Sequence, residues 1–197
     1  FRPRCNLIAA LFFFNLAHIE THTHIYGPGT RFAIWLQGCS LGCKGCWNTQ
    51  MWPHKEKTFV HREKLYQQIL GTPEINGVTF LGGEPLEQAD NTLWLINMIK
   101  DNTNLTNVVY TGFEQRELEL KGYWSTLYKN SDLIISGRYQ QSLRNTYLRL
   151  RGSTNQKLIY PQGSRLNEES DGGNEMEIII DELGSMTTLG YPEINVI

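Results

Sequence analysis

Three cysteines within one short stretch are the residues of this sequence best suited to do chemistry. Cys39, Cys43 and Cys46 follow a Cys-x3-Cys-x2-Cys spacing on a segment that also contains two glycines. Three thiolates at this spacing can bind three corners of an iron–sulfur cube, which leaves the fourth iron without a protein ligand. An iron with an open position can bind a substrate. The spacing therefore indicates a catalytic cluster rather than an electron carrier.

A structural zinc site is the alternative for the same three cysteines. Zinc usually takes four protein ligands from two separated pairs. The fourth ligand would have to be Cys5, His54 or a distant histidine, and none of these lies at a zinc-ribbon spacing. The spacing favours iron and sulfide, and zinc stays open as the alternative.

A second motif comes about thirty-five residues after the triplet. Gly82-Gly83-Glu84-Pro85 follows the apolar run 78–81, so it lies at the carboxyl end of an expected strand. The glycines let a ligand approach the backbone and permit positive φ, Glu84 adds a carboxylate, and Pro85 stiffens the exit. A tight strand-to-helix turn would explain the motif equally well on its own. Beside the cysteines, we interpret it as the second half of one site.

Together, the two motifs resemble those of the radical S-adenosylmethionine (SAM) enzymes. Within that group the chain is most similar to the activating proteins of anaerobic ribonucleoside-triphosphate reductase. The resemblance runs from about Tyr26 to Gln156 and includes Trp47-Asn48 directly after the triplet. Many radical SAM enzymes carry an aromatic residue just before the third cysteine. This chain has Gly45 there, as the reductase activators do.

The resemblance implies a fold, two cofactors and their chemistry. The fold is α/β, a partial (β/α) barrel with a mainly parallel sheet. Independently of the resemblance, the segments 175–181 and 185–189 around Glu182-Leu183-Gly184 predict a C-terminal β-hairpin. The cofactors are a [4Fe–4S] cluster on the catalytic, metal-binding Cys39, Cys43 and Cys46, and SAM, whose amine and carboxylate chelate the fourth iron. A reduced cluster then cleaves SAM to methionine and a 5′-deoxyadenosyl radical, which takes a hydrogen atom from a glycine Cα of a partner enzyme.

The resemblance also implies which side chains surround SAM. The expected contacts are Gly82, Gly83, Glu84, Pro85, Asn48, Thr111, Arg138 and Asn155. Four of these have structural alternatives: Thr111 as part of a turn, Asn48 as packing of the cysteine loop, and Arg138 and Asn155 as scaffold residues. The implied partners are a glycyl-radical enzyme, anaerobic ribonucleotide reductase, and a low-potential electron donor such as flavodoxin or ferredoxin.

Length and charge agree with a compact enzyme. The 197 residues are enough for one domain with a buried core. The formal net charge of −2 gives no basic footprint for nucleic acid. The apolar run 7–14 is too short to span a bilayer, so we expect no membrane association. Thiols that must stay free as ligands imply a reducing compartment, the cytoplasm.

The expected domain boundary lies at residue 15. We interpret 1–14 as a peripheral extension, not part of the native fold, and 15–197 as a single radical SAM domain. From Asn15 onward, His18, Glu20, His22 and His24 fall on one face of a period-2 strand, which we interpret as a polar sheet face rather than a metal site.

Alternating strands and helices predict a parallel sheet whose ligands bind beyond the carboxyl ends of its strands. Strands are expected at 31–37, 78–81, 107–111 and 132–136, with helices at 62–70, from the N-cap Asp90 through Ile99, and at 114–128. Extended segments follow at 147–151, 156–160, 175–181 and 185–189, and 164–174 is expected to be a mobile loop.

Two other function classes remain open. A small-molecule radical SAM enzyme, like the 7-carboxy-7-deazaguanine synthases, would carry Asp-Thr after the third cysteine, where this chain has Trp47-Asn48. An iron–sulfur carrier or zinc module would leave the Gly82–Pro85 motif unexplained. The chain also lacks the ferredoxin-like insert with eight further cysteines of the larger activators, which favours the reductase branch.

Overall fold

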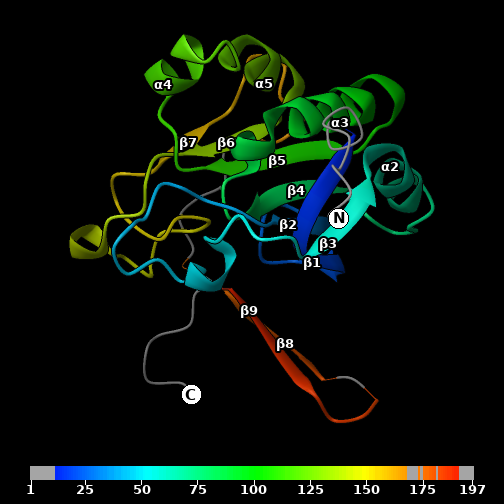
Figure 1. Cartoon of the computed structure of the whole chain (residues 1–197), viewed down its shortest axis with the longest axis horizontal. Helices are drawn as coiled ribbons and strands as arrows, with labels where there is room; N and C mark the ends of the chain where they lie inside the picture. Colours follow the sequence, from blue (N-terminus) through cyan, green and yellow to red (C-terminus); the bar gives the residue numbers. More distant parts are fainter. Residues whose placement is uncertain (1–11, 168–172, 174, 181, 191–197) are drawn as a thin grey trace, which may run out of the picture.

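The computed structural model describes residues 12–167, 173, 175–180 and 182–190. Within them, seven strands form one sheet in the order β3-β1-β2-β4-β5-β6-β7 (Figure 1). The central strands β2 (Arg31–Leu36), β4 (Gly77–Gly82), β5 (Thr106–Thr111) and β6 (Leu133–Ser136) are parallel. The antiparallel strands β1 (Phe13–Thr23), β3 (Thr58–His61) and β7 (Lys157–Ile159) flank them. The sheet is therefore mainly parallel, as the sequence predicts.

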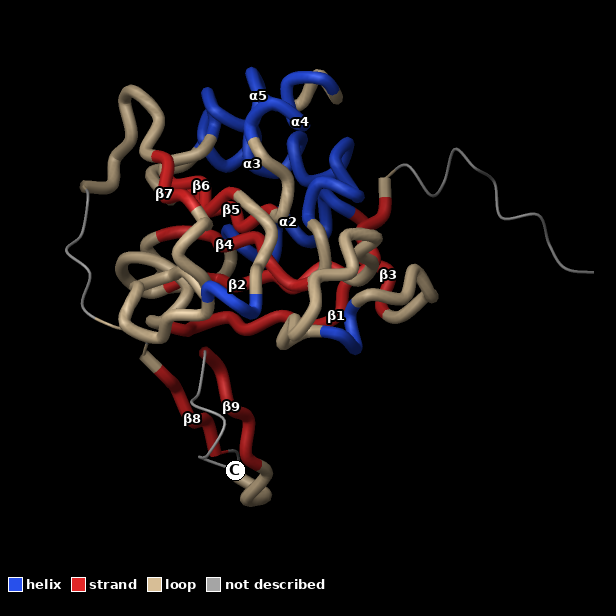
Figure 2. Tube along the Cα trace, turned by 90° about the vertical axis from the view of Figure 1, so that its left-hand side faces the viewer, coloured by secondary structure: helices blue, strands red, loops and turns tan. Residues whose placement is uncertain are grey.

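The helices cover one face of this sheet (Figure 2). They are α2 (Arg62–Leu70), α3 (Ala89–Asn102), α4 (Gln115–Leu120) and α5 (Trp124–Asn130). Three short 3-10 helices, η1 (Thr49–Met51), η2 (Pro85–Gln88) and η3 (Gln141–Leu143), belong to the connecting loops. Because β2, β4, β5 and β6 run parallel, the loops that follow them leave at the same edge of the sheet.

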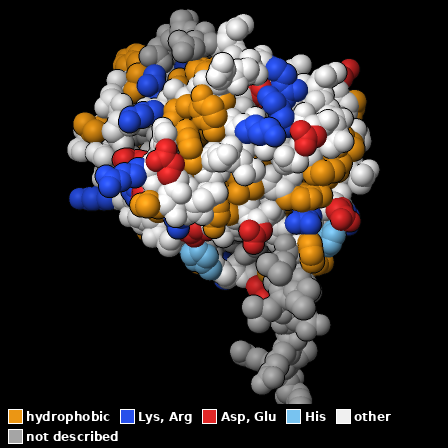
Figure 3. Space-filling view, turned by 90° about the horizontal axis from the view of Figure 1, so that it is seen from above, with side chains coloured by type: hydrophobic (Ala, Val, Ile, Leu, Met, Phe, Trp, Pro, Cys, Tyr) orange, Lys and Arg blue, Asp and Glu red, His pale blue; other side chains and the backbone are white. Residues whose placement is uncertain are grey.

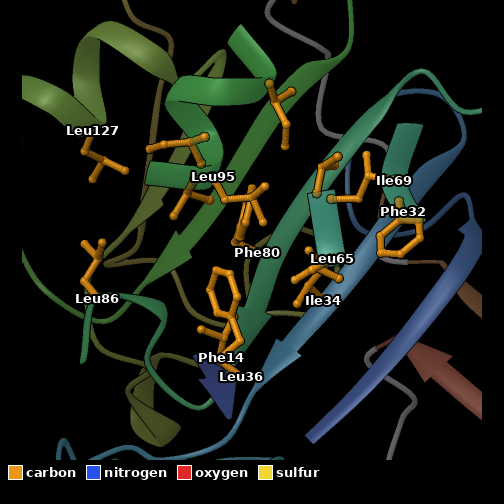
Figure 4. Close-up of a cluster of buried hydrophobic side chains, with 14 of the residues drawn as sticks. Phe14, Phe32, Ile34, Leu36, Leu65, Ile69, Phe80, Leu86, Leu95 and Leu127 are labelled. Carbon is orange, nitrogen blue, oxygen red and sulfur yellow. The ribbon is translucent and has the colours of Figure 1, made fainter. Parts of the chain in front are cut away.

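The main core fills the space between the helices and the sheet. Alternate residues of β2 point to opposite faces, so Phe32, Ile34 and Leu36 are buried under the helices, where Leu65 and Leu95 contact the same cluster (Figure 4). Each fully buried side chain of this size contributes about 1.5–3 kcal/mol. This packing holds the carboxyl ends of the strands in place.

A smaller cluster forms on the opposite face of the sheet. Trp35 of β2 packs there with Tyr26 and Leu189. Leu189 belongs to β9 (Met186–Gly190), which pairs antiparallel with β8 (Met176–Ile180) in a separate two-stranded sheet. The amide of Gly190 donates a hydrogen bond to the Tyr26 hydroxyl at 2.7 Å. The Leu189–Gly190 end of this pair therefore contacts the face that the helices leave open, and the pair projects away from the sheet (Figure 1).

The structure corrects three expected elements. The helix predicted at 114–128 is interrupted at Gly122 (φ +74°), which separates α4 from α5. Asp90 is not the N-cap of α3, because η2 runs directly into that helix and Gln88 takes the cap position. The segment 147–151 forms turns rather than an extended strand, and Leu150 adopts a left-handed conformation (φ +61°).

The expected boundary at residue 15 cuts through β1. Phe13 and Phe14 already pair with β3, and Phe14 is fully buried in the main core. The sheet therefore begins at least two residues before the expected boundary, because the apolar character of 7–14 continues into a strand. Residues 1–11, including Cys5, lie outside the described residues, as do 168–172 and 174 of the predicted mobile loop.

The helix-covered side of the molecule carries an even mixture of charges. Lys and Arg, Asp and Glu, and hydrophobic side chains are interspersed on this face (Figure 3). Among the described residues, no helix combines the length and the apolar character needed to cross a membrane.

Arg31 joins β2, β4 and β5 at the amino ends of the parallel strands. Its guanidinium is fully buried and donates to the hydroxyls of Thr79 and Thr106 and to the carbonyl oxygens of Val78, Thr106 and Pro28. Burial lowers the pKa of Arg31 to about 9. Neutral acceptors on β4 and β5 thus replace the water that this cation loses.

Replacing Arg31 should destabilise the whole sheet. In Arg31→Met the buried carbonyl oxygens of Val78 and Thr106 lose their donors, so we expect the free energy of unfolding to fall by about 3 kcal/mol. Urea unfolding of the cluster-free protein measures this change, and Arg116→Met on the exposed side of α4 is the control. Equal stability of the two variants would contradict the assigned role.

Candidate functional site

The cysteine loop starts where β2 ends. The amide of Gly38 donates to the Met51 carbonyl oxygen at 2.8 Å, and that of Cys39 donates to Trp52 at 3.0 Å, so the loop folds back on itself. Inside it, the amide of Cys46 donates to the Cys43 carbonyl oxygen at 3.0 Å. Gly45 has a φ of +74°, and a Cβ there would lie 2.8 Å from Cδ of Gln141. The positive φ, rather than the contact with the flexible Gln141 side chain, favours glycine before the third cysteine.

The glycine motif is pressed against the start of this loop. The amide of Gly83 donates to the Leu36 carbonyl oxygen at 2.8 Å, and that of Glu84 donates to Gly38 at 2.9 Å. A Cβ on Gly83 would overlap the Gly38 carbonyl oxygen, and one on Gly82 (φ +107°) would lie 2.6 Å from the Leu36 nitrogen. The glycines therefore let two backbones meet, which is a different reason from the ligand approach inferred from sequence.

Glu84 connects the end of β4 to the end of β5. One carboxylate oxygen accepts from the Leu86 amide at 3.0 Å and from the Thr111 hydroxyl at 2.8 Å, and the other accepts from the Gly112 amide at 2.7 Å. The side chain is fully buried, and burial raises the pKa of Glu84 to about 7. Both oxygens thus have protein donors, and contact with a ligand amine stays a prediction.

Glu87 holds the cysteine loop from the other side. Its carboxylate accepts from the backbone amide of Ser40 at 2.9 Å and from the Ser40 hydroxyl, and it contacts Nε2 of His54 at 2.7 Å. The hydrogen bonds from Ser40 and His54 lower the pKa of Glu87 despite its partial burial. The sequence analysis missed this residue, although its place three positions after Glu84 puts it on the same turn of chain.

A cleft at the carboxyl edge of the sheet brings the two motifs together. Its walls include all three cysteines and Gly82, Gly83 and Glu84. Of the remaining predicted residues, Asn48 and Thr111 line it, and Pro85, Arg138 and Asn155 do not. Tyr139 and Gln156, which were not predicted as site residues, line it as well. The loops after β2, β4, β5 and β6 all contribute, which places the cleft where parallel sheets bind ligands.

Arg138 and Asn155 have structural partners beside the cleft. The Arg138 guanidinium donates to both carboxylate oxygens of Glu117, at 2.7 and 2.8 Å, and these bonds lower the pKa of Glu117 to about 2. Nδ2 of Asn155 donates to the Arg138 carbonyl oxygen at 2.8 Å. Oδ1 of Asn155 is buried and has no hydrogen-bond partner among the described residues. Of this pair, Asn155 alone thus retains an unused acceptor.

Residues 25–159 match the family described as a 4Fe-4S single cluster domain. The chain belongs to this family. The match spans both motifs and every strand that borders the cleft, so the family assignment and the geometry concern the same part of the molecule.

Several curated proteins are similar to this member of the family. The "Anaerobic ribonucleoside-triphosphate reductase-activating protein" of Pasteurella multocida is 28% identical, covering 69% of this chain and 90% of its own length. The protein of the same name from Enterobacteria phage T4 is 27% identical, with 68% and 86% covered. A "Pyruvate formate-lyase-activating enzyme" of Listeria monocytogenes is 32% identical over 42% of this chain and 35% of its own. The crystal structure of QueE from Escherichia coli aligns with a TM-score of 0.40 and 20% identity, over 51% of this chain and 52% of that one.

The donor set of this 4Fe-4S domain fits its cluster better than zinc. Thiolates suit both metals, but among the residues described here no histidine or fourth cysteine lines the cleft. His54 is directed at Glu87, and His22 at the Pro73 carbonyl oxygen. In the described part of the chain, no three potential ligands already converge as a metal-binding group. The three cysteines line one cleft. To ligate a single cluster, the loop must change conformation so that the three thiols converge.

Burial favours the protonated thiols of Cys39 and Cys43. It raises the pKa of Cys39 to about 11 and also raises the pKa of Cys43. Because metal binding requires thiolates, loading the cluster must release these protons, and it should be easier at higher pH.

Glu84 should make the stability of the cluster-free protein depend on pH. Its folded-state pKa of about 7 lies above the usual 4.5, so the folded chain binds the proton more tightly than the unfolded chain. Below pH 4.5 Glu84 is protonated in both states, and its ionisation does not affect the free energy of unfolding. Between pH 4.5 and 7 the free energy of unfolding falls progressively, and above pH 7 the loss is complete and constant. The total is about 3 kcal/mol, from 1.36 kcal/mol per pKa unit.

Urea unfolding of wild type and Glu84→Gln across this range tests the assignment. Relative to the variant, the wild type should lose about 3 kcal/mol as the pH rises from 4.5 to 7. Glutamine occupies the same space but does not titrate, so any constant difference reports only its poorer hydrogen bonds. Parallel stability curves would contradict a buried, titrating Glu84.

Glu87 should control how firmly the loop retains its cluster. In Glu87→Ala, Ser40 loses its acceptor, and we expect cluster affinity to fall roughly 10–100-fold, as for other residues that orient metal ligands. Anaerobic transfer of iron to a chelator measures this affinity. Glu63→Ala, on the exposed surface of α2, is the matched control. Identical iron release from both variants would remove Glu87 from the support of the loop.

Proposed function

We propose that this protein is a radical SAM activase that generates a glycyl radical in an anaerobic ribonucleotide reductase. One observation carries the proposal: the cysteine triplet and the Gly82-Gly83-Glu84 strand end form a single cleft. Relatives named as activating proteins of that reductase support it, because their similarity extends over 86–90% of their own length. Cys39, Cys43 and Cys46 would ligate three irons of the cluster.

The bound cluster and SAM supply a 5′-deoxyadenosyl radical, and the protein places them. The electron would come from an external low-potential donor such as flavodoxin or ferredoxin, and the carbon–sulfur bond of SAM would break to give methionine. A hydrogen atom from the partner glycine Cα would complete 5′-deoxyadenosine and leave the radical on that glycine. The chain's own contribution is orientation, exclusion of water and tuning of the cluster potential.

Several residues are proposed to position SAM. The backbone of Gly82 and Gly83 and the Asn48 side chain border the cleft and would contact the methionine part. Thr111 would act by orienting Glu84, to which it donates a hydrogen bond. The unused Oδ1 of Asn155 would accept a hydrogen bond from a ribose hydroxyl of SAM. Arg138 would contribute its positive charge beside Cys43 while it stays paired with Glu117.

The finer features of the fold belong to this proposal too. We propose that the sheet forms the partial barrel of the radical SAM enzymes, that the β8–β9 pair is a C-terminal hairpin added to it, and that residues from 12 onward form one domain. We also propose that the protein is cytoplasmic, because exposed iron–sulfur clusters require a reducing environment. We propose no nucleic-acid or membrane partner.

Reconstitution tests the function in two steps. Anaerobically loaded protein should contain about four irons and four sulfides, and with dithionite it should convert SAM to 5′-deoxyadenosine and methionine. With the reductase of the same cell, it should then produce a glycine-centred doublet in electron paramagnetic resonance. Alanine at Cys39, Cys43 or Cys46 should abolish both steps, whereas Cys5→Ala should abolish neither.

Two results would contradict the proposal. Stoichiometric zinc without iron in anaerobically purified protein would exclude the cluster. Efficient SAM cleavage that modifies a small metabolite, with no radical in any glycyl-radical enzyme, would move the protein to the small-molecule class.

A further inference from the structure

A second cavity lies directly beside the cluster cleft. One wall is the end of the cysteine loop, with Cys46, Trp47 and Asn48, and the other is the segment after β6, with Tyr139, Thr146 and Gln156. Cys46, Asn48, Tyr139 and Gln156 line both cavities. The two cavities therefore adjoin, and these four residues belong to the walls of both.

The outer wall of this cavity is built as a closed loop. Arg144 and Ser153 form an antiparallel bridge, and the amide of Thr154 donates to the Leu143 carbonyl oxygen at 2.9 Å. Oε1 of Gln156 accepts from the Gly152 and Ser153 amides at 2.9 and 3.2 Å. These bonds join both ends of the loop, so the wall is formed before any ligand arrives.

A buried leucine anchors the same loop to the sheet. Leu150 is only 4% exposed and packs on Val108, Leu133 and Ile135, although its backbone has a φ of +61°. A non-glycine residue in this conformation costs about 1 kcal/mol or more, which the surrounding contacts must offset. Burying Leu150 directs the preceding residues outward, and Tyr147 is 78% exposed.

Two large, exposed aromatic side chains belong to the two segments that wall this cavity. Trp47 is 45% exposed, and Tyr147 adjoins Thr146, which lines the cavity. A small ligand inside the cavity would leave Tyr147 in water, whereas a protein segment crossing the mouth would cover both rings. Aromatic residues of this size dominate the affinity of protein interfaces. The exposed rings therefore favour a polypeptide over a metabolite.

We infer that the second cavity receives the polypeptide loop that carries the target glycine of the partner, between Trp47 and Tyr147. This inference rests on the proposed function and specifies where the partner enters. A glycine-containing loop suits the position, because its backbone can pass the shared wall of Asn48 and Tyr139 and bring a Cα to the cluster cleft. The exposed aromatics then hold the flanking residues.

Two variants separate docking of the partner from SAM chemistry. Tyr147→Ala removes an anchor, and Thr146→Trp fills the cavity; neither residue lines the cluster cleft. Phe59→Ala on β3, 50% exposed, and Ser125→Trp on the exposed side of α5 are the matched controls. For each loaded protein, iron content, SAM cleavage without partner, and the initial rate of glycyl-radical formation in the reductase are measured.

Both cavity variants should keep their iron and cleave SAM within about twofold of wild type. Radical formation should fall at least tenfold, and for Tyr147→Ala a higher reductase concentration should restore most of it. A synthetic peptide with the sequence around the target glycine should inhibit wild type but not Thr146→Trp. Both controls should behave as wild type.

The possible failures are distinguishable. Normal SAM cleavage together with wild-type radical formation in both cavity variants would overturn the docking site and leave the activase function intact. A wild-type protein that cleaves SAM but forms no radical in the reductase would overturn both.

Discussion

The close approach of two backbones at the carboxyl edge of the sheet is the constraint on which the site depends. The chain after β4 crosses the chain after β2 so closely that no side chain fits at Gly82 or Gly83. Hydrogen bonds from Gly83 to Leu36 and from Glu84 to Gly38 fix this crossing. The cysteine loop therefore begins from a fixed point. A side chain at Gly83 would separate the two halves of the site.

Two buried ionisable groups stabilise the sheet from opposite ends. Arg31 lies at the amino edge of the parallel strands and is satisfied by neutral acceptors, whereas Glu84 lies at the carboxyl edge and is satisfied by neutral donors. Within the described part of the chain, neither forms a hydrogen bond with an oppositely charged group, and burial shifts the pKa of each toward its neutral form. In return, each joins neighbouring strands with directional bonds. Glu84 does so beside the cluster, where strand ends must keep their positions.

A short run of polar residues after the glycines organises the surroundings of the cluster. Glu84 reaches β5, Glu87 reaches Ser40 and His54, and Gln88 bonds to the backbones of Asn15 and Gln37. One turn of chain thus connects β1, the cysteine loop and β5. The same arrangement leaves the far side of the loop, at Trp47, free to face the second cavity. One side of the cysteine loop is therefore held by hydrogen bonds to Glu87, and the other side borders the second cavity.

The sequence by itself indicated the chemistry and most of the regular elements. Cysteine spacing and the glycine motif indicated an iron–sulfur site of the radical SAM kind, and local periodicity placed α2 at its observed bounds and the parallel strands within one residue. Only the tertiary structure showed that the Glu84 carboxylate accepts hydrogen bonds from Thr111 and Gly112. It also showed that Arg138 pairs with Glu117 and that Phe14 belongs to the core. Spacing and periodicity report on neighbours along the chain, so they identify ligands and elements. The partners of a buried polar group lie tens of residues away, and only the packing of the sheet decides which of them it meets.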